Sequence, residues 1–304
     1  MRSWADHIKG AVTLLELRGE DQFCNSIGIE IFSQLRAQIV GLSDPKLLSY
    51  LPNQQTISCL QREVAIPNTV VRWSNKVCSY MTGHDSLSHN LSDVLARLCS
   101  IKEDIHTRHR APVSALLKIH EDLQNWVTTI PAIYIYTTVV VETCPEVLSG
   151  YYHIYHKPWT AALWNNYRCA TILVHDLIIY TLSTLNPPSL NDKQDILDRL
   201  VISQSIMDRH CLEICASVPY YLNFQNCRGT CPDSPDSMSR VADCQSLIWP
   251  VYVAASMDNS SDMMRGWAMV QLIRLGRMIG TKHTNVLASL LKSRGEISKW
   301  LEGE

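Results

Sequence analysis

Apolar side chains recur every three or four residues along almost the entire chain, and this spacing limits the fold more than any other feature of the sequence. A period near 3.6 residues places apolar side chains on one face of an α-helix, whereas a half-buried strand would show strict alternation. The repeat is clear at Leu87, Leu91, Leu95 and Leu98. We therefore predict an all-α fold in which residues 1–304 form a single multi-helix, bundle-like domain.

Prolines and capping residues mark the ends of the predicted helices. One helix is predicted over 158–185, with Pro158 in its first turn and a Pro-Pro pair just beyond its end. A second long helix is predicted over 191–219, with Asn191 as its cap. Residues 226–243 have the composition of a mobile loop. Further helices are predicted to begin at Gln245, Asp262 and Thr284.

The remaining segments give a less uniform pattern. In the N-terminal part, one predicted helix ends at Gly19. Another shows a four-residue repeat from Phe23 to Leu35 and is predicted to end near Gly41 and Pro45. Residues 130–141 are rich in β-branched residues and tyrosine, which suits a strand. We leave this segment unassigned.

The balance of charges excludes several classes of function. The chain carries 27 Lys plus Arg against 29 Asp plus Glu, a formal net charge of −2. Because nucleic-acid binding depends on basic residues that neutralise phosphates, we expect no autonomous nucleic-acid binding. The longest apolar stretches are short and interrupted by polar residues, so we expect no membrane span. The first residues lack the apolar core of a signal peptide.

Eleven cysteines are dispersed along the chain, and no C-x-x-C pair occurs among them. Such a set is typical of reduced thiols, which places the protein in the cytoplasm, or in the nucleus if it is a regulator. The nearest approach to a metal constellation is Cys211-x3-Cys215 and Cys227-x3-Cys231 beside His210. Zinc-binding pairs usually enclose two residues, so we prefer buried thiols and predict no metal and no cofactor.

Four segments, in a fixed order, carry a family pattern. They are Trp4-x-x-His7-x-x-Gly10-Ala11, the run WNNYRCATILVHDLIIY over 164–180, ICASVP over 214–219 and IWPVYVA over 248–254. In this order they resemble the C-terminal regulatory domain of fungal zinc-cluster transcription factors. In that family the helical domain follows a DNA-binding zinc cluster, which needs six thiolates within about 30 residues. This sequence has no such group of cysteines.

Aromatic and imidazole groups gather just before the predicted helix over 158–185, in the run YYHIYHKPW over 151–159. Such density is typical of small-molecule sites, and it is also typical of buried helix contacts. Both interpretations stay open. On the first, the domain encloses an internal hydrophobic pocket for a small hydrophobic substrate or ligand. The predicted substrate-binding residues are His156, Trp159, Trp164, Asp176, Tyr220, Trp249 and Tyr252.

Three residues are predicted to polarise a substrate carbonyl or to orient a carboxylate. Arg168 and His175 lie seven residues apart on one face of the predicted helix, and Tyr152 is a further donor. Arg168 has a second interpretation, in which it and Asn165 anchor neighbouring loops through hydrogen bonds. The family resemblance implies this anchoring role, because the W-N-x-x-R element recurs whatever gene is regulated.

Two hypotheses for function remain after the familiar catalytic signatures are excluded: no G-x-S-x-G, G-x-G-x-x-G, P-loop or H-E-x-x-H occurs. The first is a cofactor-independent cyclase or isomerase of the Diels–Alder type, acting on a hydrophobic fungal natural-product intermediate. Such catalysis needs a closed apolar pocket and one or two donors. The second is a regulatory, ligand-sensing or protein-interaction domain of a fungal transcription regulator. Because Met1 stands three residues before Trp4, which leaves no room for a zinc cluster, we favour the cyclase. Homodimer formation is left open.

Overall fold

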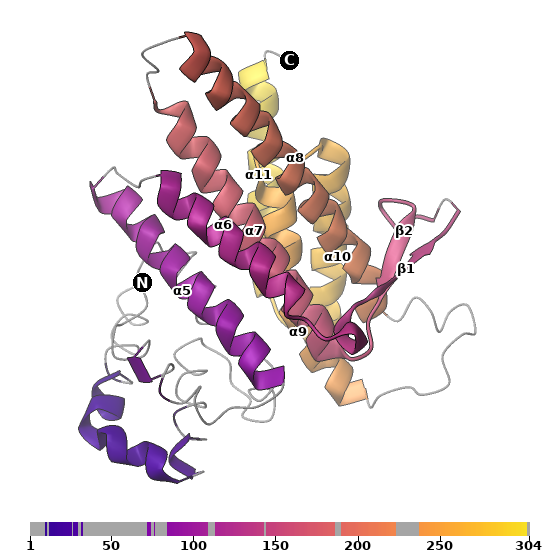
Figure 1. Ribbon diagram of the computed structural model, residues 1–304. Helices are drawn as coiled ribbons and strands as arrows, with labels where there is room; N and C mark the ends of the chain where they lie inside the picture. The colour runs from indigo at the N-terminus through magenta and orange to yellow at the C-terminus, as the bar shows by residue number, and fades with distance from the viewer. Residues whose placement is uncertain are drawn as a thin grey trace. The chain divides into compact units, whose positions relative to one another are not determined.

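A computed structural model describes residues 12–25, 84–108, 113–142, 144–185, 190–222 and 237–302, together with isolated positions at 10, 27–29, 32, 72, 73 and 76. The chain divides into two compact units, residues 1–130 and 131–304. Figure 1 labels helices and strands along the chain. The prediction that the whole chain forms one domain stays a prediction.

The first unit has a small aromatic core beside a pair of longer helices. Its core residues are Leu15, Phe23, Phe32 and Trp73, and the three aromatic rings meet edge to face. Gly19, at φ 64°, ends the helix over 12–18 as predicted, because a residue without a Cβ adopts this angle most easily. The predicted start of an α-helix at Phe23 is wrong. Phe23 lies in the short 3-10 helix η1, Glu20–Cys24.

Helices α5, His84–Arg108, and α6, Val113–Thr128, follow in this unit. The leucines that carry the helical repeat in α5 are buried, as the amphipathic pattern predicts. The indole N–H of Trp126 in α6 donates to the Leu87 carbonyl of α5 over 2.9 Å, and Arg97 of α5 pairs with Asp122 of α6 at 2.7 Å. These contacts hold the two helices together. The N-terminal family segment and the predicted continuation to Leu35 lie almost wholly outside the described residues.

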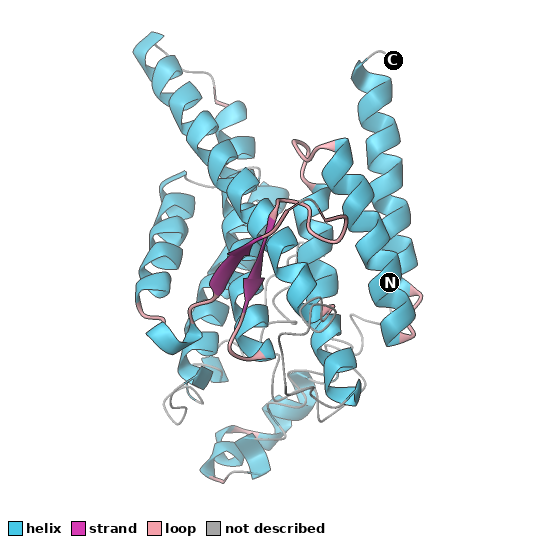
Figure 2. Cartoon of the chain, turned by 90° about the vertical axis from the view of Figure 1, so that its right-hand side faces the viewer, coloured by secondary structure: helices cyan, strands magenta, loops and turns pink. Residues whose placement is uncertain are grey.

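The second unit is helical apart from one hairpin, so the all-α prediction is confirmed for the part of the chain that the structure describes (Figure 2). A 3-10 turn, η3, Ala132–Tyr134, leads into the antiparallel strands β1, Thr137–Val140, and β2, Tyr151–Ile154. Five helices follow: α7, Pro158–Ser183; α8, Leu190–Tyr221; α9, Ser237–Ser256; α10, Asp262–Ile279; and α11, His283–Glu302.

Helix α7 is buried along most of its length, because α8 and α9 both pack against it. Helices α8 and α9 also pack against each other, so the three elements predicted to surround a pocket are indeed neighbours. The apolar side chains of α7 are spread over more than one face, which suits a helix that is covered by neighbours on more than one side. The enclosed pocket itself stays a prediction.

The predicted starts of α7 and α10 agree with the structure, but both predicted ends of α8 are wrong. Pro158 occupies the first turn of α7, and α10 begins at Asp262, with the Ser261 hydroxyl accepting from the Met264 amide. Asn191 lies inside α8, which begins at Leu190, so it is not the cap, and the helix continues through Pro219 to Tyr221. Helix α9 begins at Ser237 and not at Gln245, so residues 237–243 are helix and the predicted loop over 226–243 is wrong there. These residues include no Gly or Pro, which would break a helix. The part of that loop before Ser237 lies outside the described residues.

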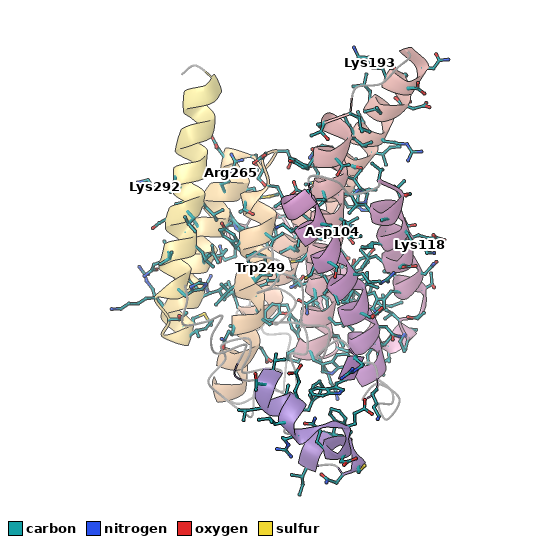
Figure 3. The ribbon with its side chains drawn as sticks, turned by 90° about the vertical axis from the view of Figure 1, so that its left-hand side faces the viewer. Asp104, Lys118, Lys193, Trp249, Arg265 and Lys292 are labelled. Carbon is teal, nitrogen blue, oxygen red and sulfur yellow. The ribbon has the colours of Figure 1, made fainter. Side chains whose placement is uncertain are left out.

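Arg265 joins the start of α10 to the end of α9. Its Nη2 donates to the carbonyls of Met257, at 3.2 Å, and Asp258, at 3.0 Å, just beyond the last residue of α9 (Figure 3). Cationic donors at a helix C-terminus satisfy its last carbonyls. Among the described helices, none combines the length and the apolar character needed to cross a bilayer.

Replacing either of two glycines of α10 by alanine is expected to change the free energy of unfolding, in opposite directions at the two positions. A Cβ at Gly276 would lie 1.9 Å from Thr284 Oγ1 and 3.1 Å from the Thr281 carbonyl oxygen, whereas a Cβ at exposed Gly266 would meet nothing within 4 Å. Thr284 is fully buried and stiff at χ1, so it has little room to move. We expect Gly276→Ala to lower the free energy of unfolding by about 1–3 kcal/mol. Gly266→Ala should raise it by about 0.5–1 kcal/mol.

Urea unfolding of the two variants measures both effects against the wild type. The close approach of α10 and α11 at Gly276 would be contradicted if Gly276→Ala were as stable as Gly266→Ala.

Candidate functional site

The W-N-x-x-R element of α7 uses all of its polar side chains within the protein. Trp164 Nε1 donates to the Tyr134 carbonyl over 2.9 Å, and Asn165 Nδ2 donates to Ser217 Oγ of α8 over 2.9 Å. Arg168 Nη1 donates to Tyr155 Oη at 2.7 Å and to Asn165 Oδ1 at 2.9 Å. The element therefore ties α7 to the segment before the hairpin, to the end of β2 and to α8. These hydrogen bonds are of the kind that the anchoring interpretation of Asn165 and Arg168 predicts, although Ser217 and Glu213 belong to helix α8 and not to a loop.

Glu213 of α8 is the acceptor on which the other groups converge. Its Oε2 accepts from Tyr136 Oη at 2.8 Å, from His153 Nε2 at 2.9 Å and from Arg168 Nη2 at 3.3 Å. Its Oε1 lies 3.4 Å from Tyr151 Oη. A carboxylate offers about four acceptor positions, so these donors nearly fill its capacity. We call Glu213, Arg168 and these three hairpin residues the Glu213 cluster.

The hairpin supplies its part of the cluster through strand alternation. Side chains at every second residue of a strand share one face, so Tyr151, His153 and Tyr155 project together toward α8. The register pairs Thr138 with His153, and Thr138 Oγ1 lies 3.2 Å from His153 Nδ1. This contact fixes the imidazole with its other nitrogen toward Glu213.

Aromatic rings surround the guanidinium of Arg168. Its central carbon lies 4.8 Å from the ring centre of Tyr136, 5.9 Å from that of Trp164 and 6.0 Å from that of Tyr155. Tyr220 of α8 packs edge to face on Tyr155 at 5.3 Å. Cation–π contacts of this kind are strengthened when the cation is desolvated. Arg168, only 1% exposed, occupies an aromatic cage that belongs to its own chain.

Neighbouring groups of the cluster keep both Glu213 and Arg168 in their charged forms. Burial alone would raise the pKa of Glu213, but the hydrogen bond from His153 and the charge of Arg168 outweigh burial and lower this pKa to about 2. Burial alone would lower the pKa of Arg168, yet Tyr155, Tyr136 and Glu213 raise it above its usual value. Both groups are therefore charged at neutral pH. The Glu213 side chain is 20% exposed, so the carboxylate lies near the edge of the cluster.

The surrounding donors are neutral. Burial lowers the pKa of His153, although its hydrogen bond to Glu213 acts in the opposite direction. A neutral His153 that donates from Nε2 must accept at Nδ1, which matches a hydroxyl donation from Thr138. Burial raises the pKa of Tyr151 and of Tyr155 to about 12. The Tyr151 phenol donates to Glu213, whereas the Tyr155 phenol accepts from Arg168, and neither ionises near neutral pH.

The three predicted catalytic residues are not brought together in this cluster. Arg168 lies at its centre, but alternation along β2 points Tyr152 to the opposite face of the hairpin from His153. Both Tyr152 and His175 are buried. His175 lies seven residues further along α7. Their action on a substrate stays a prediction.

The predicted substrate-binding residues are dispersed over several surroundings. Trp164 and Tyr220 take part in the aromatic surroundings of Arg168, while His156 and Asp176 are exposed. Trp159 packs on Tyr134 with ring centres 4.8 Å apart. On α9, Trp249, labelled in Figure 3, lies 5.6 Å from Tyr252 between ring centres.

The residues predicted for the site did not include Glu213, Tyr136, Tyr151 or His153, although Tyr151 and His153 belong to the aromatic run over 151–159 that the sequence analysis singled out. For the hairpin residues the sequence held a signal. If residues 151–154 are taken as a strand, Tyr151 and His153 project from one face and Tyr152 from the other. For Glu213 the signal is weaker. It lies four residues before Ser217 and seven before Tyr220, so the three share one face of α8.

The described cysteines of α7 and α8 are buried thiols, as preferred from the sequence. Burial raises the pKa of Cys211 to about 12 and also raises the pKa values of Cys169 and Cys215. Such thiols stay protonated, and a protonated thiol is a poor metal ligand. No group of three metal-binding side chains occurs among the described residues. Cys227 and Cys231 lie outside them.

The arrangement is suited to holding a structure together more than to chemical turnover. Its carboxylate is ionised at neutral pH and is surrounded by four donors, so it is a weak general base. Its cation is 1% exposed, and the three hydrogen bonds of its guanidinium go to protein groups.

No protein-family model matches this chain, and neither the curated proteins nor the solved structures include a significant match to it. The resemblance to the fungal regulatory domain thus stays a prediction from the sequence segments.

Proposed function

We propose that this chain is a regulatory helical domain of the kind found in fungal zinc-cluster transcription factors, and that it acts through contacts with other proteins. The observation that carries the proposal is that the polar side chains of the W-N-x-x-R element form hydrogen bonds within the same chain. Arg168 reaches Tyr155, Asn165 and Glu213, and the hydrogen-bonding groups of the motif serve the fold. A motif that recurs whatever gene is regulated is expected to have such a role.

The same observation weighs against the cyclase as the preferred function. A cyclase of this type needs a preorganised donor aimed at the substrate. The guanidinium predicted for that task already donates to three protein acceptors and is 1% exposed, so a substrate group could reach it only if the surrounding side chains moved. The cyclase hypothesis therefore stays a prediction from the sequence.

A tethering experiment tests the proposed function. The full chain is fused to an unrelated DNA-binding module upstream of a reporter gene in a fungal host. We expect reporter expression to change relative to the DNA-binding module alone, because a regulatory domain acts by recruiting other proteins. In parallel, the purified chain is incubated with polyene-type intermediates, and no cyclised product is expected.

The two arms separate the hypotheses. An unchanged reporter together with a cyclised product, formed faster than in buffer, would reverse the order of the two functions. A fusion carrying Arg168→Met, which is expected to weaken the fold, controls for effects that do not need the folded domain.

A further inference from the structure

The outer edge of β1 presents unpaired main-chain groups in a fixed pattern. Strand β1 pairs with β2 alone in a two-stranded sheet, and none of the described residues pairs with its other edge. The Val141 amide donates to the Gly150 carbonyl over 2.9 Å, which makes that pair a hydrogen-bonded one. In an antiparallel ladder such pairs alternate, so Thr138 and Val140 direct their N–H and C=O groups away from β2.

An independent contact supports this assignment. Side chains of non-hydrogen-bonded pairs stand closer together than those of hydrogen-bonded pairs. Thr138 and His153 form such a pair, and their side chains meet at 3.2 Å. The outward donors and acceptors of β1 are thus set by the register of the hairpin.

The hairpin holds this edge at the surface in a rigid form. The Glu213 cluster fixes one end of the hairpin on α8, and Trp267 Nε1 of α10 donates to the Pro145 carbonyl of the connecting loop over 3.2 Å. The strands face the viewer in Figure 2. The Val140 side chain is 81% exposed, the largest exposure among the large hydrophobic residues of the described chain.

The amino-acid composition of β1 and its neighbours indicates what kind of strand could pair with its outer edge. Residues 131–141 carry no charged side chain, and 137–141 are all β-branched. Edge strands of soluble proteins are usually protected by charges, prolines or bulges, because a bare edge recruits another strand. A charged foreign segment would find no counter-charge here, whereas a second copy of the same neutral strand meets no like charge.

We propose that β1 pairs edge to edge with β1 of a second copy of this chain, antiparallel about a two-fold axis. With Thr138 of one copy opposite Val140 of its partner, and the reverse, the outward groups form two hydrogen-bonded pairs, or four main-chain hydrogen bonds. The two hairpins become one four-stranded sheet, and the contact is isologous, as in most homodimers. The pairing needs only the geometry of the hairpin and is independent of the proposed function.

Sedimentation velocity on the full chain over a range of concentrations tests the pairing. We expect a monomer–dimer equilibrium in the wild type that Val140→Lys weakens by about tenfold or more, because an edge lysine blocks strand addition. Val140→Pro should act in the same direction, since it removes an outward N–H that β2 does not use. The matched control is Val286→Lys, which places the same charge on an exposed site of α11 that is 57% exposed.

The outcomes are distinct. A wild-type chain that stays monomeric at about 100 μM, where a weak interface would still associate, would overturn the pairing and leave a foreign extended segment as the partner to seek. Equal weakening by Val140→Lys and Val286→Lys would also overturn it, because the loss would then follow charge and not the edge. Circular dichroism of each variant confirms that the helices are intact.

Discussion

Replacing Arg168 by methionine is expected to lower the free energy of unfolding by about 3–5 kcal/mol, because it removes one partner of a buried ion pair. Methionine fills a similar length with apolar atoms, so the loss arises mainly from electrostatics and hydrogen bonds. Glu213 keeps its charge in a partly buried position, and Tyr155 and Asn165 lose their donor. The aromatic rings also lose the cation that they surround.

Urea unfolding followed by circular dichroism measures this effect. Arg199→Met is the matched control: the same substitution at an exposed position of α8 should change stability by less than about 0.5 kcal/mol. The double variant Arg168→Met/Glu213→Gln should recover part of the loss, because the uncompensated carboxylate is gone. Equal midpoints for Arg168→Met and Arg199→Met would show that the cluster contributes nothing to the fold.

Lowering the pH from 7 to 4 is expected to reduce stability by an amount on the order of 3 kcal/mol through His210 alone. Burial, followed by the nearby charges of Arg209 and Arg168, lowers the pKa of His210 to about 3. Glu213 acts in the opposite direction, and His175 adds slightly to the lowering. The ring packs edge to face on Tyr167 at 5.5 Å.

The direction of the effect follows from proton binding. In the unfolded chain His210 binds a proton below its ordinary pKa of 6.5, whereas in the folded protein it stays neutral until about pH 3. The unfolded state therefore binds more protons between these values, and stability falls as the pH falls through this window. His153 contributes in the same direction, since its pKa is also lowered. Glu213 adds a further loss only below its ordinary pKa of 4.5, down to about pH 2.

The substitution His210→Phe isolates the contribution of one residue. Phenylalanine keeps the contact with Tyr167, and it loses no bond at Nδ1, which has no hydrogen-bond partner among the described residues. We expect the variant to have a flatter dependence of unfolding free energy on pH between 6.5 and 4.5. His283→Phe, the same substitution at an exposed position of α11, is the matched control. A slope that His210→Phe does not reduce would contradict the buried, neutral state of His210.

The helices of this protein follow from local sequence. The positions of Leu87, Leu91 and Leu95 predicted a helix that the structure contains as α5, and Pro158 predicted the first turn of α7. Such signals act within three or four residues, where the 3.6-residue period and the missing N–H of proline operate directly. Composition was a poorer guide at residues 237–243. The predicted loop extended over these residues, whereas the structure has them in helix α9.

The polar cluster was decided by tertiary structure alone. Glu213 meets Tyr136 across 77 residues of sequence, His153 across 60 and Arg168 across 45. The spacing on α7 identified Arg168 as a residue of interest, but no local pattern specified its acceptor or the side of the hairpin that faces it. Periodicity fixes which side chains share a face of one element, whereas the identity of the facing element depends on how the whole core packs. For this reason the sequence predicted the helices and the anchoring arginine, and only the folded chain joined that arginine to its carboxylate.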